Sequence, residues 1–142
     1  LMAVFGAPQP LEAPGRCALR AAAEMVAMVE QFSQEQQALG RPAIRIGVGV
    51  ASGDVVAGYT GTRQRATYTC IGDTVNVASR LETLTKEFAA ELVVSQELLD
   101  RAGITLPDAP AHEVEIRGRQ GRLAVRAVAS LASLGAALTP KS

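Results

Sequence analysis

The sequence predicts one domain that mixes helices and strands around a single core, of the α+β or α/β class. Segments with the three- and four-residue spacing of buried helices interleave with short runs of β-branched residues, and no internal repeat occurs. The 142 residues fit one domain. Hydrophobic residues make up 48% of the chain and charged residues 20%, which is ordinary for a globular protein.

The first third of the chain is expected to hold a strand, a long helix and a second strand. Residues 1–5 read as a short buried strand, which a proline-rich turn ends. Residues 14–39 read as a helix, whose apolar stripe consists of Leu19, Ala22, Val26, Val29 and Phe32. In residues 44–50 the β-branched residues alternate with Arg45, Gly47 and Gly49, which predicts a strand. Its small face indicates that a helix or a ligand approaches closely.

The middle of the chain is expected to hold a strand followed by a helix. Residues 55–58 extend briefly, residues 60–65 read as a polar loop, and residues 68–71 return to strand. Gly72 breaks this strand, and Asp73 is placed to cap the next helix. The buried stripe expected for that helix consists of Val77, Leu81, Leu84 and Phe88.

The last third is expected to hold a strand, a short helix and a hairpin of two strands. These elements are predicted at residues 92–95, 96–102, 113–116 and 123–129. From residue 133 the chain reads as a flexible linker. We therefore expect a domain over residues 1–132 and a C-terminal tail over residues 133–142.

Charge and cysteine content argue against several classes of protein. Fourteen basic and 14 acidic residues balance to zero net charge, and no dense basic block indicates a nucleic-acid-binding face. The two cysteines, Cys17 and Cys70, have no spacing typical of zinc or of a disulfide framework, so we expect reduced thiols in the cytoplasm. No run of 18 apolar residues occurs, so we expect no insertion into a membrane.

One polar pair stands out at the start of the helix after Gly72. Asn76 and Arg80 are four residues apart, so both project from one side of that helix, turned by about 100° from the apolar stripe that begins at Val77. An amide and a guanidinium near the positive end of a helix suit a phosphate ligand. A solvated polar face explains the same spacing, however, so spacing alone leaves both interpretations open. Asp73 fits a cap better than a metal ligand.

Four segments resemble the catalytic domains of class III nucleotidyl cyclases, most of all bacterial adenylate cyclases. Residues 68–86, YTCIGDTVNVASRLETLTK, resemble the central motif of the family. Residues 44–58, IRIGVGVASGDVVAG, resemble its glycine-rich strand and turn. The opening LMAVFGAP is similar to the strand after the second metal-binding aspartate, and EIRGRQG at residues 115–121 resembles the basic turn. The segments have the order and spacing of the family over nearly the whole chain.

The resemblance implies a ferredoxin-like palm domain, with a mostly antiparallel sheet packed against helices. It also implies a head-to-tail pair, formed as a homodimer or with another cyclase domain, with ATP in the cleft between the two. Two Mg²⁺ or Mn²⁺ ions, held by two aspartates, would activate the ribose 3′-hydroxyl. This hydroxyl would attack the α-phosphate, and the products would be cyclic AMP and pyrophosphate.

The resemblance also implies roles for particular residues. Asn76 matches the position that orients the ribose, and Arg80 the position that stabilises charge in the transition state. Thr69 matches the base-recognition position, and a threonine hydroxyl can accept a hydrogen bond from the adenine amino group. Arg117, or alternatively Arg119, matches the basic residue that contacts the terminal phosphates.

The sequence departs from the family at the metal site. Both metal-binding aspartates match positions upstream of Leu1, and no aspartate of this chain stands in for them. We therefore expect no metal ligands here, a domain incomplete at its N-terminus, and no turnover from the 142 residues alone. Two alternatives to an adenylate cyclase remain: a guanylate cyclase, and a catalytically silent cyclase-homology module that dimerises with or regulates another domain.

Overall fold

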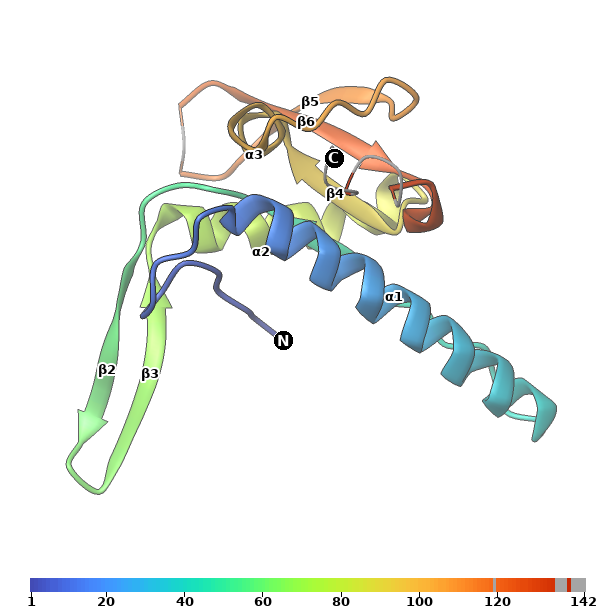
Figure 1. Ribbon diagram of the computed structural model, residues 1–142, viewed down its shortest axis with the longest axis horizontal. Coiled ribbons are helices and arrows are strands. Elements are labelled where there is room, and N and C mark those ends of the chain that lie inside the picture. The colour runs from blue at the N-terminus through green and yellow to red at the C-terminus, as the bar shows by residue number, and fades with distance from the viewer. Residues whose placement is uncertain (119, 135–137, 139–142) are drawn as a thin grey trace.

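The structure is a computed structural model that describes residues 1–118, 120–134 and 138. A four-stranded sheet forms its centre, in the order β1 (Val48–Val50), β4 (Leu92–Ser95), β6 (Arg122–Val128) and β5 (Ala111–Glu115). β1 and β4 run parallel, whereas the β4–β6 and β6–β5 pairs are antiparallel. Helices pack against this mixed sheet, which confirms the predicted α+β class (Figure 1).

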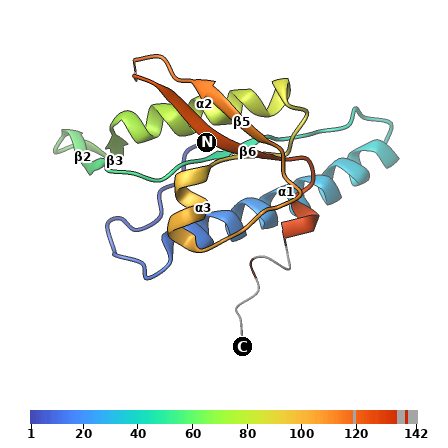
Figure 2. The ribbon, with the colours of Figure 1, turned by 90° about the horizontal axis from the view of Figure 1, so that it is seen from above.

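The helices cover both faces of the sheet. Figure 2 shows α2 (Asp73–Glu87) on one side, and α1 (Pro14–Ala38) with α3 (Gln96–Ala102) on the other. The three helices confirm the segments that hydrophobic spacing predicted, and the β5–β6 hairpin and β4 also lie where they were expected. None of the helices among the described residues is long and apolar enough to cross a membrane.

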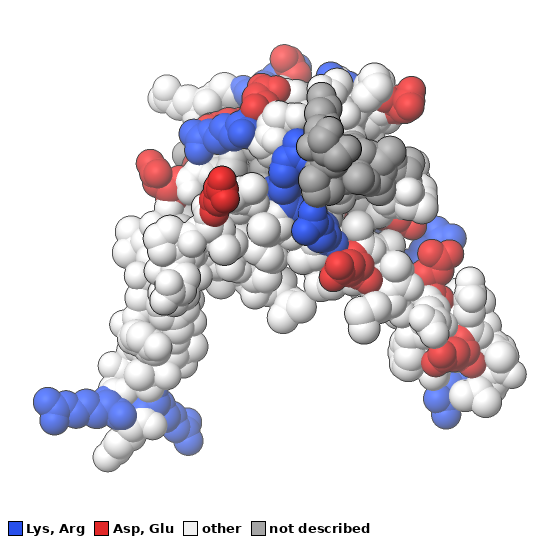
Figure 3. Space-filling model, in the orientation of Figure 1, with Lys and Arg blue, Asp and Glu red and all other residues white. Residues whose placement is uncertain are grey.

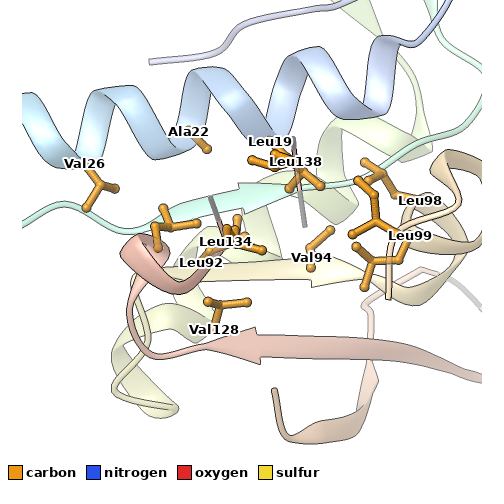
Figure 4. Close-up of a cluster of buried hydrophobic side chains, with 12 residues drawn as sticks. Leu19, Ala22, Val26, Leu92, Val94, Leu98, Leu99, Val128, Leu134 and Leu138 are labelled. Carbon is orange, nitrogen blue, oxygen red and sulfur yellow. The ribbon is translucent and has the colours of Figure 1, made fainter. Parts of the chain in front are cut away.

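Strand β4 lies between two core clusters. All four of its residues are buried, and successive side chains point to opposite faces of the sheet. Leu92 and Val94 face α1 and α3, where they belong to the same buried cluster as Leu19 and Leu99 (Figure 4). Val93 points to the opposite face, into the cluster beneath α2. Each fully buried side chain of this size stabilises the fold by about 1.5 to 3 kcal/mol relative to exposure. Helix α2, which carries the candidate site, is therefore fixed directly to the central strand.

Strand β1 is shorter than the alternating pattern predicted. Only Val48 to Val50 pair with β4, and Ile44 and Ile46 lie outside the ladder with exposed side chains. The backbone N–H of Ile44 instead donates to Oγ of Ser33 on α1, at 2.8 Å. The segment before β1 is thus tied to α1. The strand begins late because its first residue, Val48, pairs with Leu92, where β4 itself begins.

A long hairpin replaces the loop that was predicted over residues 60–65. β2 (Val56–Thr62) pairs with β3 (Arg65–Ile71) along its whole length, and the turn is formed by Arg63 and Gln64. Tyr59 and Tyr68 pack edge to face across the pair, with ring centroids 5.3 Å apart. The loop prediction was wrong because most of the hairpin is exposed, so its residues lack the apolar alternation that marks a half-buried strand.

The two ends of the chain also differ from expectation. Residues 1–5 form no strand, because nothing in the described part of the chain pairs with them, and Leu1 and Met2 are exposed. Near the other end, Leu131–Leu134 form a 3-10 turn, η1. Leu134 and Leu138 are buried in the cluster against α1, so the predicted tail is packed at these two positions. Residues 135–137 and 139–142 lie outside the described residues, and the domain limits stay a prediction.

Candidate functional site

The start of α2 is fixed by the turn that precedes β2. Gly72 is the residue before the helix, and its φ of 153° is a backbone conformation that favours glycine. Oγ1 of Thr74 donates to the carbonyl oxygen of Asp54 at 3.1 Å, which ties the helix to that turn. The expected Asp73 cap is wrong: Asp73 is the first helical residue, and its side chain makes no capping bond. Its carboxylate instead lies in the first turn, where the helix dipole favours negative charge.

Packing of α2 against the sheet determines where Asn76 and Arg80 lie. Val77, Leu81 and Leu84 are buried and hold one face of the helix in the core. Asn76 and Arg80 are exposed beside that face. Within the described part of the chain, neither side chain forms a hydrogen bond or an ion pair, so both are available to a ligand.

The turn between β5 and β6 lies next to this face of α2. Ile116 anchors it, because its side chain is buried in the same cluster as Leu81 and Leu84. Arg117 follows Ile116 directly and is exposed. Across the hairpin, Glu115 is the register partner of Arg122, and Arg122 Nε lies 3.9 Å from Glu115 Oε1.

These elements surround one open hollow with a volume of about 920 Å³. Its lining residues are Asn76 and Arg80 from α2, and Glu115, Ile116, Arg117, Gly121 and Arg122 from the β5–β6 hairpin. Three guanidinium groups and one carboxylate therefore face the same space. The arrangement suits an anion with several negative charges, because a guanidinium offers a fork of N–H donors that matches phosphate oxygens.

The structure brings together three of the five residues singled out in the sequence. Asn76, Arg80 and Arg117 line the hollow, although about 40 residues separate Arg117 from the other two along the chain. Arg119 lies outside the described residues. Glu115 and Arg122 were missed as site residues, and the only signal in the sequence was their place on either side of the predicted basic turn.

Thr69 lies apart from these residues. It sits on β3 opposite Gly58, is half-buried, and does not line the hollow. Gly58 presents no side chain, so a ligand or a partner chain can approach Thr69 along that pair of strands.

The described residues do not fit a divalent metal site. Among them, no group of three or more histidine, cysteine, aspartate or glutamate side chains could hold a metal ion. Asp73 and Asp54 belong to a helix start and a turn, as described above. No step of a reaction is therefore assigned to a metal held by these residues.

The family model described as the adenylate and guanylate cyclase catalytic domain matches residues 1–127 of this chain. An uncharacterized protein of Mycobacterium tuberculosis is 39% identical over 104 residues, which make up 73% of this chain and 18% of that protein. Adenylate cyclase 1 of Rhizobium meliloti is 31% identical over 123 residues, which make up 87% of this chain and 18% of that protein. The chain thus spans about a fifth of the length of these curated relatives.

The fold agrees with these matches. The crystal structure of the guanylyl cyclase Cya2 superposes with a TM-score of 0.76 over 89% of this chain and 63% of that chain, at 24% sequence identity. Such a likeness shows the fold alone, whereas the family match covers most of the sequence, including Asn76, Arg80 and Arg117. The resemblance seen in the sequence is confirmed: the chain belongs to the family of adenylate and guanylate cyclase catalytic domains.

Proposed function

We propose that this chain is part of an adenylate cyclase, which converts ATP to 3′,5′-cyclic AMP and pyrophosphate between two cyclase domains. The observation that carries the proposal is the convergence of Asn76, Arg80 and Arg117 on one hollow. Helix α2 supplies the amide of Asn76 and the guanidinium of Arg80, and the distant hairpin turn supplies the guanidinium of Arg117. No described residue forms an ion pair with either guanidinium. A silent module has no need of such an arrangement.

Each residue has a physical role in the proposed reaction. Attack of the 3′-hydroxyl on the α-phosphate gathers negative charge on a crowded phosphorus, and the fixed Arg80 guanidinium stabilises that charge. The Asn76 amide holds the ribose so that its hydroxyl is in line with the leaving group. Arg117 binds the terminal phosphates, which leave as pyrophosphate. Arg119 is the alternative for this last role.

A second cyclase domain, either another copy of this chain or a related one, completes the proposed site. The hollow is open to solvent on this chain alone, and the β2–β3 hairpin extends away from the body (Figure 1). Apart from Arg63 and Arg65 at its tip, the hairpin carries no charged residue, as its white surface shows (Figure 3). An unsupported two-stranded hairpin is marginally stable in water, so a packing partner is expected.

The choice of ATP over GTP rests on Thr69. The hydroxyl of Thr69 can accept a hydrogen bond from the amino group of adenine. The identity to adenylate cyclase 1 of Rhizobium meliloti supports the same choice. Divalent ions, Mg²⁺ or Mn²⁺, are part of the proposal as cofactors, with ligands outside these 142 residues.

Cyclic nucleotide formation tests the proposal. The 142-residue chain and a version extended upstream to the whole catalytic domain are each incubated with Mn-ATP and with Mn-GTP. We expect cyclic AMP from the extended protein alone. Asn76→Ala and Arg80→Ala should each lower its kcat by about two orders of magnitude, because each removes a group that acts in the transition state.

Lys86→Ala is the matched control for Arg80→Ala. Lys86 is an exposed cation on the same helix, but it does not line the hollow, so its removal should leave kcat unchanged. Cyclic GMP as the main product would make the protein a guanylate cyclase. If neither product forms at high protein concentration, the silent dimerisation module replaces the proposal.

A further inference from the structure

Glu115 and Arg122 form a loose ion pair at the edge of the hollow. The two residues face each other across the β5–β6 hairpin, and 3.9 Å separates Arg122 Nε from Glu115 Oε1. A strong charge-assisted hydrogen bond is shorter, about 2.7 to 2.9 Å. The ion pair between Glu97 and Arg101 on α3 has such a distance, 2.8 Å. Within the part of the chain that the structure describes, most of the N–H donors of Arg122 are therefore unused.

The charges around the hollow are unbalanced. Arg80 and Arg117 have no ion-pair partner within the described part of the chain, and Glu115 is the one carboxylate among the lining residues. Figure 3 shows acidic and basic side chains next to one another above the base of the β2–β3 hairpin. An anion that enters the hollow meets an attractive Arg122 and a repulsive Glu115 at the same place. Glu115 therefore competes with that anion for the guanidinium.

We propose that Arg122 is a third phosphate-binding guanidinium of the hollow, and that Glu115 is its resident counter-ion, displaced when a polyphosphate binds. The exposed, stretched ion pair costs little to break. Once it is broken, Arg122 adds its donors to those of Arg80 and Arg117, while Glu115 still weakens binding by repulsion. The pair sets how tightly the site holds the triphosphate of the substrate and the pyrophosphate that leaves.

The inference deepens the proposed function, but it can be tested without turnover. The probe is inorganic tripolyphosphate, titrated into the 142-residue chain by calorimetry in metal-free buffer of low ionic strength, where charge effects are least screened. Arg122→Gln should weaken binding by about tenfold, because it removes a charged donor from the anion. Glu115→Gln should strengthen binding by about two- to fivefold, because the competing charge is gone.

The ion pair between Glu97 and Arg101 supplies matched controls. Both side chains are exposed, and neither lines the hollow. Glu97→Gln and Arg101→Gln make the same changes of net charge as the two test variants, and should alter tripolyphosphate binding by less than about twofold. Thermal melting curves check that all four variants remain folded.

Three results would overturn the inference: unchanged binding by Arg122→Gln, equal gains from Glu115→Gln and Glu97→Gln, or no binding by the unchanged chain at millimolar probe. Equal gains would mean that only net charge matters. None of these results would bear on the proposed function, since the cyclase assay measures product formation by the extended protein and not tripolyphosphate binding. Conversely, an inactive extended protein removes the proposed reaction but not an anion site that binds tripolyphosphate.

Discussion

Gly49 of β1 lies directly against the backbone of α2 at Ala78. A Cβ atom at Gly49 would overlap the carbonyl oxygen of Ala78, and it would lie 2.8 Å from the carbonyl carbon of Leu81. The strand and the helix therefore pack with no side chain between them at this point. Since Ala78 lies between Asn76 and Arg80 on α2, this contact sets how far these two candidate site residues stand from the sheet.

Gly49→Ala is expected to push α2 away from the sheet. Overpacking of this kind costs about 1 to 3 kcal/mol of unfolding free energy, which the urea midpoint measures. Because the backbone of α2 cannot yield as a flexible side chain does, we also expect lower cyclase activity in the extended protein at temperatures where it stays folded.

Gly58→Ala is the control for this prediction. A Cβ at Gly58 would meet nothing within 4 Å, so the same substitution should change stability by less than about 1 kcal/mol. Equal losses at Gly49 and Gly58 would show that strand backbone entropy, rather than the contact with α2, decides the effect.

Ile116 connects the core to the basic turn. Its side chain packs beneath α2 immediately before Arg117. Ile116→Ala should cost about 2 to 5 kcal/mol of stability and also free the turn, so tripolyphosphate affinity should fall. Ile104→Ala is the comparison, because Ile104 is equally buried, 5% exposed like Ile116, but belongs to the other cluster.

The two variants separate general destabilisation from a local effect on the site. We expect similar shifts of the urea midpoint, but a loss of anion affinity for Ile116→Ala alone. If both variants bind tripolyphosphate equally well in the low-salt buffer of the calorimetric titration, without urea, the packing of Ile116 does not position Arg117.

Buried elements were the ones that could be predicted from the sequence. The α1 helix begins at Pro14 as expected, and β4 and α3 match their predicted ranges, because apolar spacing records which face meets the core. The β2–β3 hairpin shows no such apolar spacing in the sequence, since both of its faces are largely exposed. Residues 1–5 have the composition of a strand, but no described residue pairs with them. A strand needs a partner as well as a suitable composition.

The candidate site shows the same division. Spacing placed Asn76 and Arg80 on one side of a helix, and family resemblance added Arg117. The pairing of Glu115 with Arg122 depends on the hairpin register, which the predicted strand limits of 113–116 and 123–129 did not determine. The geometry of the turn decides which residues of the two strands face each other. The hydrophobic pattern within one strand therefore could not predict that Glu115 faces Arg122.

Thr69→Val tests the assignment of the base-recognition residue. Valine keeps the shape of threonine but removes the hydroxyl that would accept from adenine, so KM for ATP should rise by about tenfold in the extended protein. Thr67→Val is the control: Thr67 lies two residues earlier on the same face of β3, further out along the hairpin. If both substitutions change KM equally, the hydroxyl of Thr69 does not recognise the base.

The exposed apolar residues of the β2–β3 hairpin are expected to bury against a second cyclase domain. Val56 and Ile71, directly opposite each other where the hairpin joins the body, are 74% and 62% exposed. Val56→Lys and Ile71→Lys place a charge in that interface, so the dimer fraction of the extended protein in sedimentation velocity should fall, together with cyclic AMP formation. Met28→Lys is the control, because Met28 is 71% exposed on α1, away from the hairpin. Loss of dimer in the control alone would place the interface on α1 instead, and the open hollow would then have to be covered from that side.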